Sequence, residues 1–264
     1  MNGDAVMEQC ISEILGRTEL GRSYVKLDFS VPWKNLPVPG QFVSLGCGDD
    51  ILLKRPFSIA GFEAGGASVI FKVVGNGTEF LSQRSPGDRI TVLGPLGNGF
   101  PAEREHEVIY AGGGCGLPPL LYDISLRRGG KGGPLVFAGF RTASDIALTG
   151  ELEAEGAEVR VVTEDGSEGE TGLVTGILEK YLESLENNCI IFSSGPMAMQ
   201  KAVASLCISR GIEGFLCLER YMACGIGACQ SCVQPVRHGK GDVEYARVCV
   251  EGPVFRVRQI VWDE

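Results

Sequence analysis

The sequence contains no basic cluster, no long apolar run and few histidines. Its 24 lysines and arginines are outnumbered by 33 aspartates and glutamates, which gives a formal net charge of -9 at pH 7. A nucleic-acid backbone or an anionic membrane surface would require a basic face, so this charge argues against both as partners. No apolar run approaches the ~18 residues of a membrane-spanning helix. The two histidines, His106 and His238, stand in polar surroundings without a G-x-S-x-G motif, which argues against hydrolytic catalysis.

The first ten residues also lack the basic and apolar regions of a secretory signal, since they contain Asp4 and Glu8. We therefore expect a cytoplasmic protein whose thiols are reduced. At 264 residues and 44% apolar composition, the chain is long enough for two domains and a small module. Six of the 10 cysteines are expected to be small buried hydrophobic residues. These are Cys10, Cys47, Cys115, Cys189, Cys207 and Cys217.

The other four, Cys224, Cys229, Cys232 and Cys249, have the spacing C-x4-C-x2-C with a fourth cysteine further on. This is the plant-type 2Fe-2S ligand spacing. The intervening glycines let the backbone wrap closely around a cluster, with amides directed at its sulfur atoms. Four thiolates also suit tetrahedral zinc, but structural zinc sites usually pair two C-x2-4-C knuckles and only one is present. We therefore predict a 2Fe-2S cluster, with zinc as the nearest alternative.

The spacing of the apolar runs divides the chain into three segments. Short β-rich runs separated by Gly and Pro fill residues 1–102 and predict an antiparallel β-barrel. Residues 103–213 alternate strand, turn and helix, which predicts an α/β domain with a doubly wound parallel sheet. Residues 214–264 form a small module that needs its metal to fold well. The strands expected in the barrel are 24–29, 41–45, 57–60, 67–74 and 89–93. The strands expected in the α/β domain are 108–111, 135–140, 159–163 and 190–193. The helices expected in that domain are 117–127, 173–185 and 196–210.

Two motifs in the first segment suit a bound pyrophosphate. Arg55 begins the sequence Arg-Pro-Phe-Ser, and a guanidinium offers a planar fork to two phosphate oxygens. Gly77 and Thr78 lead into a short helix expected at 79–84, where free amides and a hydroxyl favour an anion. Each motif alone is also explained as a surface arginine or an ordinary helix cap. Together, in a barrel followed by a nucleotide-binding sheet, they indicate a dinucleotide site.

With the glycine-rich sequence at 94–100 and the βα turn that follows, this order of motifs resembles the ferredoxin reductase-like flavoprotein superfamily over nearly the whole chain. The resemblance implies that residues 1–102 form an FAD-binding barrel, in which Arg55 binds the pyrophosphate and its neighbours line the flavin. Lys72 stands where relatives often have arginine. The residues so implied in FAD binding are Arg55, Pro56, Phe57, Ser58, Ile70, Phe71, Lys72, Gly77 and Thr78.

A glycine turn at 112–116 follows the first strand of the second segment and opens a helix. It departs from the dinucleotide fingerprint G-x-G-x-x-G because Pro119 stands in the place of the third glycine, so a purely structural turn also explains it. A second turn at 193–197 ends a later strand of the same predicted sheet. In the superfamily that the chain resembles, these two loops hold NAD(P). The implied residues are Gly112, Gly113, Gly114, Gly116, Ser194, Gly195, Pro196 and Met197.

No acidic residue at the end of the second strand decides between NAD and NADP. Arg141 stands there instead, and its guanidinium would suit a 2'-phosphate or lie exposed to solvent. We expect NAD as the cofactor and expect that Arg141 does not enforce NADP.

The sequence around the cysteines narrows the resemblance. Residues 219–232 and 247–255 closely resemble the electron-transfer subunit of class 1B dihydroorotate dehydrogenase. The resemblance implies an oxidoreductase subunit without catalytic residues of its own, paired with an FMN-containing catalytic subunit as a heterotetramer of two plus two. Electrons from dihydroorotate would pass through 2Fe-2S and FAD to NAD+ in pyrimidine biosynthesis. The interface with the partner is expected to include the loop at 222–227.

Two other interpretations stay open. A related flavin and iron-sulfur subunit of a ferredoxin-NAD(P) or sulfide oxidoreductase would carry the same cofactors. A zinc-stabilised binding module would be colourless and would not oxidise NADH.

Overall fold

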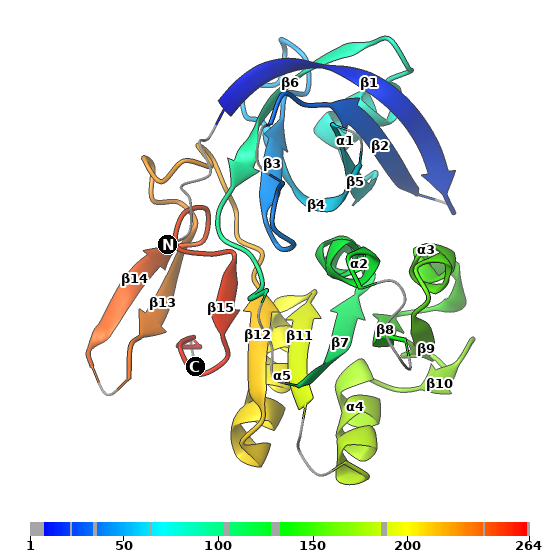
Figure 1. Cartoon of the computed structure of the whole chain (residues 1–264), viewed down its shortest axis with the longest axis vertical. Helices are drawn as coiled ribbons and strands as arrows, with labels where there is room; N and C mark the ends of the chain where they lie inside the picture. Colours follow the sequence, from blue (N-terminus) through cyan, green and yellow to red (C-terminus); the bar gives the residue numbers. More distant parts are fainter. Residues whose placement is uncertain are drawn as a thin grey trace.

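The computed structural model describes residues 8–21, 23–33, 36–63, 65–102, 106–127, 133–185, 189–239 and 241–262. Within these residues the strands form a closed barrel, a seven-stranded sheet and a two-stranded hairpin (Figure 1). Helix α2 (Leu117–Ser125) lies between the barrel and the sheet, and the hairpin lies beside the sheet edge (Figure 1). No helix in the described part of the chain is long and apolar enough to cross a membrane.

The barrel confirms the predicted antiparallel architecture. Its strands follow the order β1-β2-β5-β4-β3-β6, and every neighbouring pair is antiparallel. Side chains such as Leu27, Val69 and Val92 point inward and are fully buried, because alternate residues of a strand face the same side. The strands are β1 (Glu8–Leu20), β2 (Tyr24–Ser30), β3 (Phe42–Leu45), β4 (Arg55–Glu63), β5 (Gly66–Lys72) and β6 (Arg89–Leu96).

Helix α1 (Asn76–Ser82) follows β5 and begins three residues earlier than the helix expected at 79–84. The Thr78 hydroxyl accepts hydrogen bonds from the amides of Val74 and Gly75 at 2.9 and 3.1 Å and donates to the Gly75 carbonyl at 2.8 Å. These contacts satisfy the first backbone groups of the helix, which fixes its start at Asn76.

The second segment contains the predicted doubly wound sheet. The strand order is β10-β9-β8-β7-β11-β12-β15, and all pairs are parallel except β12 with β15. The winding direction reverses between β7 and β11, which is where α/β sheets bind ligands. The strands are β7 (Glu107–Gly113), β8 (Leu135–Phe140), β9 (Glu158–Thr163), β10 (Glu170–Thr171), β11 (Cys189–Ser194), β12 (Glu213–Cys217) and β15 (Val254–Arg256).

Helices cover both faces of this sheet, as the alternation of buried side chains requires. Tyr110 and Phe192 belong to the apolar cluster under α2 and α3 (Thr149–Ala154). Their neighbours Ile109 and Ile191 belong to the cluster under α4 (Val174–Glu183) and α5 (Met197–Arg210). The strands are therefore buried on both faces, which accounts for their continuous apolar sequences.

The third segment packs into the sheet rather than standing apart. Strands β13 (Val233–Arg237) and β14 (Val243–Arg247) form the hairpin, but β15 pairs with β12 at the sheet edge. The boundary expected between residues 213 and 214 falls inside β12. The same apolar cluster contains Cys232 and Cys249 together with side chains of the sheet and Phe42 of the barrel. The division at 102, 213 and 264 stays a prediction, and the core crosses it.

Candidate flavin, nucleotide and iron-sulfur sites

Seven of the nine residues predicted to bind FAD, all except Arg55 and Gly77, line one cavity of about 260 Å³ where all three segments come together. Strand β4 supplies Pro56, Phe57 and Ser58 at its start, and the end of β5 supplies the second wall. Residues far away in the sequence close the cavity. The lining includes Pro56, Phe57, Ser58, Ile70, Phe71, Lys72 and Thr78 from the first segment, and Cys115, Pro118, Cys217, Glu219 and Met222 from the others.

Arg55 does not line this cavity but lies beside the start of helix α1. Its Nη1 donates a hydrogen bond to the Leu53 carbonyl at 2.7 Å. A Cβ atom at Gly77 would lie 3.1 Å from the Arg55 Nε, so the absence of a side chain lets the guanidinium approach the helix. The structure therefore brings the two motifs together, and the hydroxyl of Thr78 supports the turn that presents Gly77.

A larger cavity of about 680 Å³ opens at the carboxyl edge of the parallel sheet. Gly113, Gly114 and Gly116 line it from the turn after β7, and Gly195 and Pro196 line it from the turn after β11. This is the switch point of the sheet, where the predicted nucleotide loops lie side by side.

Three of the predicted nucleotide residues do not line the cavity. Gly112 is inside β7, where a Cβ atom would lie 2.3 Å from the Leu117 side chain. Ser194 is buried and donates its hydroxyl to the Cys217 carbonyl at 3.4 Å. Met197 begins helix α5 without lining the cavity, and Met199 lines it instead.

The two glycine turns approach each other closely. A Cβ atom at Gly116 would lie 2.3 Å from the Ser194 carbonyl oxygen. One at Gly113 would lie 2.9 Å from Pro196 and 3.0 Å from the Met199 sulfur. Glycine is needed here because the neighbouring turn occupies the space of a side chain.

The two cavities share a wall formed by Lys72, Cys115 and Glu219. The Cys115 thiol donates to the Tyr24 hydroxyl at 3.6 Å. Burial is the main cause of the raised pKa of Tyr24, and the neighbouring Cys115 thiol raises it further. Glu219 lines both cavities. The protein atoms that surround it in the cleft bury its carboxyl, and this burial raises the pKa of that group. Cys115 is exposed rather than buried as expected, because it lies within the glycine turn that lines the cavity.

Lys72 forms an ion pair with Asp145 at 3.1 Å and lies over the Tyr24 ring, with its Nζ 5.7 Å from the ring centre. The hydrogen bond from Lys72 lowers the pKa of Asp145. This contact joins the end of β5 to the 3-10 turn η2 (Ala143–Asp145) across the cleft. Arg141 and Glu164 line the same cavity at the ends of β8 and β9. The nucleotide cavity thus has both a cation and two carboxylates at the strand ends.

The four motif cysteines gather as two pairs. The amide of Cys229 donates to the Cys224 sulfur at 3.4 Å, and the amide of Ile226 donates to the same sulfur at 3.5 Å. In the second pair, the Cys249 thiol is hydrogen-bonded to the Cys232 side chain. Two irons that share four thiolates take two each, so two pairs of cysteines suit a 2Fe-2S cluster, although no three metal-binding side chains converge on one point among the described residues.

Local contacts favour a thiolate at Cys229. The Ser231 hydroxyl lies 3.3 Å from the Cys229 sulfur and, with backbone and Cys224 contacts, lowers the pKa of Cys229 to about 6. Cys229 is exposed, whereas Cys232 and Cys249 are only 2% exposed. The sulfur set therefore has one edge at the surface and one edge in the core.

The cysteine loop packs against the barrel next to the flavin motif. Gly225 is buried with a φ of 70°, and a Cβ atom there would lie 3.1 Å from the Ser44 hydroxyl on β3. Ser44 pairs with Pro56 in the register of β3 and β4. One strand thus separates the cysteine loop from the Arg-Pro-Phe-Ser motif.

Sequence reasoning did not identify Tyr24, Asp145, Glu164, Met199 or Glu219 as site residues. They come from separate loops and strand ends, and only the fold brings them to the cleft. The motifs around Glu164 and Asp145 carry no signal of their own. Glu219 adjoins the cysteine loop in sequence, which was its one available signal.

Residues 219–261 match the family model described as the iron-sulfur cluster binding domain of dihydroorotate dehydrogenase B. Several similar proteins are described as the electron transfer subunit of dihydroorotate dehydrogenase B (NAD(+)). The one from Desulforamulus reducens is 37% identical over 243 residues, which cover 90% of this chain and 92% of that protein. The one from Caldanaerobacter subterraneus subsp. tengcongensis is 37% identical over 95% of this chain and 98% of its own. The one from Bacillus velezensis is 41% identical over 86% of this chain and 88% of its own.

Solved structures share the fold. An NADH-dependent reduced ferredoxin-NADP oxidoreductase, studied for flavin-based electron bifurcation, is similar with a TM-score of 0.81 and 27% identity. The similarity covers 99% of this chain and 92% of that chain. The cytochrome b5 reductase domain of Ulva prolifera nitrate reductase is similar in fold alone, with a TM-score of 0.64 and 18% identity over 78% of this chain and 94% of its own. The predicted combination of barrel, doubly wound sheet and iron-sulfur module is confirmed.

Replacing Gly225 by alanine should displace the cysteine loop from the barrel. The left-handed φ disfavours alanine by about 1–2 kcal/mol, and the new Cβ meets Ser44. We expect less bound iron and sulfide per chain and a lower free energy of unfolding in urea.

Gly176→Ala is the matched control, because a Cβ atom at Gly176 in helix α4 has no neighbour within 4 Å. This change should leave the metal content unchanged and stabilise the helix by up to ~1 kcal/mol. Equal metal content in the Gly225→Ala and Gly176→Ala proteins would show that the close approach to Ser44 is not needed.

Proposed function

Because the chain belongs to the family of dihydroorotate dehydrogenase B electron transfer subunits, we propose that it carries electrons from an FMN-containing catalytic partner to NAD+. It is an oxidoreductase subunit that uses FAD, a 2Fe-2S cluster and NAD, and the substrate site belongs to the partner. The observation that carries the proposal is the cleft itself. There the flavin cavity touches the nucleotide cavity on one side, and the cysteine loop lies one strand away on the other.

A nicotinamide exchanges a hydride, whereas an iron-sulfur cluster exchanges single electrons, and bound FAD can do both. The order nicotinamide, flavin, cluster follows from the positions of the three sites. Tyr24, Lys72 and Asp145 hold the cleft between the first two sites in a fixed shape through their mutual contacts. The substrate site would lie on the partner, so this chain would need no acid or base for substrate.

We assign FAD binding to the predicted residues, with two roles. Pro56, Phe57, Ser58, Ile70, Phe71 and Lys72 would line the flavin ring. Arg55, Gly77 and Thr78 would hold the pyrophosphate, since the guanidinium lies beside the glycine in the first turn of helix α1. Thr78 would act through the turn that its hydroxyl stabilises.

We assign NAD binding to the two glycine turns. Gly113, Gly114, Gly116, Gly195 and Pro196 would lie against the nucleotide, and Gly112, Ser194 and Met197 would support the turns from outside the cavity. The carboxylates of Asp145 and Glu164 at the strand ends disfavour a 2'-phosphate by like-charge repulsion. Arg141 lines the same cavity as these two carboxylates and therefore does not enforce NADP.

We assign the cluster to Cys224, Cys229, Cys232 and Cys249. The exposed edge at Cys229 would face the catalytic subunit, and the buried edge at Cys232 and Cys249 would lie toward the flavin. Apolar side chains surround the exposed edge, with Tyr221 96%, Ile226 45% and Val250 41% exposed. An exposed apolar patch of this kind is typical of a protein–protein interface. We propose that it binds the catalytic subunit in a two-plus-two heterotetramer.

The second candidate function is a flavin and iron-sulfur subunit of a ferredoxin-NAD(P) oxidoreductase. The similarity to the NADH-dependent reduced ferredoxin-NADP oxidoreductase over nearly the full chain favours it. Both candidates use the same cofactors and cleft, so the electron donor distinguishes them.

The decisive experiment isolates the complex that co-purifies anaerobically with this chain and measures NAD+ reduction by dihydroorotate. Activity in the complex and none in the chain alone is the expected result. A coloured complex that NADH reduces, but that does not oxidise dihydroorotate, would move the chain to the ferredoxin-linked alternative. A colourless chain that does not oxidise NADH would contradict both.

The nucleotide assignment predicts a preference for NADH over NADPH that depends on Glu164. The Glu164→Gln substitution removes the negative charge of this side chain. It should lower the ratio of kcat/KM for NADH to kcat/KM for NADPH about tenfold, or ~1.4 kcal/mol, mainly through a lower KM for NADPH. The measurement is steady-state reduction of an artificial electron acceptor by either nucleotide. A wild-type preference for NADPH that Arg141→Ala abolishes would reverse the assignment.

The interface assignment predicts that Ile226→Glu weakens the complex, because it places a charge in an apolar contact. Ile208→Glu is the matched control, since Ile208 is 44% exposed on helix α5, on the outer side of the sheet. Size-exclusion chromatography of the co-expressed subunits should show dissociation only for the first variant. An intact complex with Ile226→Glu would exclude this loop from the interface.

A further inference from the structure

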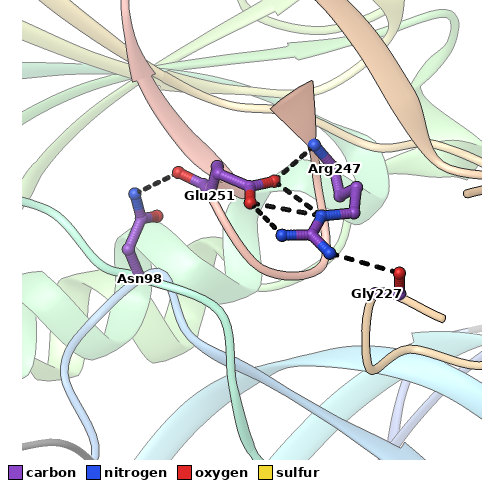
Figure 2. A network of polar contacts seen from close by, with 4 residues as sticks. All are labelled: Asn98, Gly227, Arg247 and Glu251. Carbon is purple, nitrogen blue, oxygen red and sulfur yellow. Dashed lines mark hydrogen bonds and ion pairs between the residues drawn. The ribbon is translucent and has the colours of Figure 1, made fainter. Parts of the chain in front are cut away.

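Arg247 lies at the end of β14 between the cysteine loop and the segment that returns to the sheet (Figure 2). Its Nη1 donates a hydrogen bond to the Gly227 carbonyl at 3.3 Å. Its Nε lies 3.2 Å from both carboxylate oxygens of Glu251, and its Nη2 also binds that carboxylate. The Arg247 amide donates to the same carboxylate at 2.6 Å. One arginine therefore joins the loop to a carboxylate that is itself held at two points.

The barrel fixes the position of this ion pair (Figure 2). The Asn98 side chain donates to the Glu251 carbonyl at 2.8 Å and accepts the Val254 amide at 2.9 Å. The backbone amide of Asn98 donates to the Gly252 carbonyl at 2.6 Å. Asn98 follows the end of β6, so these bonds hold the returning segment against the first domain. The guanidinium is thus positioned relative to the barrel as well as to the loop.

Arg247 also lies next to the buried pair of cysteines. It precedes Cys249 by two residues, and its strand partner Val233 adjoins Cys232. The Val248 amide donates to the Cys232 carbonyl at 3.0 Å, which holds the two strands together at this point. Gly227, whose carbonyl accepts from Arg247, is hydrogen-bonded through its backbone to the Cys249 thiol. The positive charge and an oriented peptide group therefore both lie near the inner pair of cysteines.

We propose that Arg247 raises the reduction potential of the cluster and that Glu251 moderates this effect. The inference rests on the proposed 2Fe-2S site. In the proposed direction, the cluster would gain one electron, and so one negative charge, from the FMN of the catalytic partner, and would then give that electron to FAD. A fixed cation beside the sulfurs stabilises the reduced form, and hydrogen bonds and charge are the known determinants of such potentials. Arginine suits this role because it keeps its charge at any working pH.

A purely structural clamp would behave differently from a charged residue. If Arg247 only holds the loop, then removing either member of the ion pair loosens the same contact and has the same effect. If charge matters, then loss of the cation and loss of the carboxylate shift the potential in opposite directions. The side chains of Arg247 and Glu251 are 38% and 42% exposed, so solvent reduces both shifts.

The test measures the cluster potential in the complex with its catalytic partner, by anaerobic redox titration with the electron paramagnetic resonance signal of the reduced cluster as readout. Arg247→Gln should make reduction of the cluster about tenfold less favourable, which is about 59 mV more negative. Glu251→Gln should shift the potential to more positive values. Arg247→Lys keeps the charge without the forked geometry and should stay nearer to the wild-type value than Arg247→Gln.

Two variants on the same hairpin serve as matched controls. Arg237→Gln and Glu244→Gln remove one charge of each sign from exposed positions, and residues 237 and 244 lie toward the turn of the hairpin, away from the cysteines. Their potentials should equal that of the wild type. Shifts of the same size in these controls would show a general effect of surface charge and overturn the proposal.

Equal shifts in the same direction for Arg247→Gln and Glu251→Gln, or no shift in either, would also overturn it. If Arg247→Gln fails to retain a cluster, the opposite shift in Glu251→Gln and the value for Arg247→Lys still decide the matter. A wild-type complex without a reducible cluster signal would instead contradict the proposed function.

Discussion

The close approach of the cysteine loop to strand β3 is the constraint on which the arrangement of sites depends. Gly225 occupies a left-handed conformation and leaves room for no side chain against Ser44, which pairs with Pro56 of the flavin motif. A bulkier loop would stand further from the barrel and lengthen the distance that an electron must cross. The shared core confirms that this approach is built into the fold, because Cys232, Cys249 and Phe42 belong to one apolar cluster.

A second set of contacts determines how the two cavities meet. The Lys72–Asp145 ion pair crosses the cleft from barrel to sheet, and the Tyr122 hydroxyl of helix α2 donates to the Pro37 carbonyl at 2.8 Å. These bonds restrain the barrel against the nucleotide-binding domain at two separate points. Exposed ion pairs contribute little stability, so the value of Lys72–Asp145 lies mainly in fixing geometry.

The sequence predicted those parts of the molecule whose chemistry demands fixed spacing. The four cysteines come together as two pairs, and the glycine turns lie where strands of a parallel sheet end; the assignment of the cysteines as cluster ligands stays a prediction. Strand β1 was missed because its inward positions include the polar Ser12, whereas the apolar Ile11 and Leu15 face outward, so the alternation of burial in the strand is not an alternation of apolar residues in the sequence. Lys72, Cys115 and Glu219 share a wall only because three distant segments meet, and no local pattern records that meeting. Met199 replaces Met197 in the cavity because the first turn of α5 directs the earlier side chain elsewhere.

The position of the fourth ligand has a consequence for how the protein matures. Cys249 and the strand β15 that secures it follow the barrel, the sheet and the hairpin along the chain. During synthesis the ribosome therefore releases three thiols well before the last one, and the Asn98 contacts to residues 251–254 form later still. With Cys249 as the proposed fourth ligand, a nascent chain that ends before it lacks one of the four thiols, so only a polypeptide synthesised beyond Cys249 could supply the complete set.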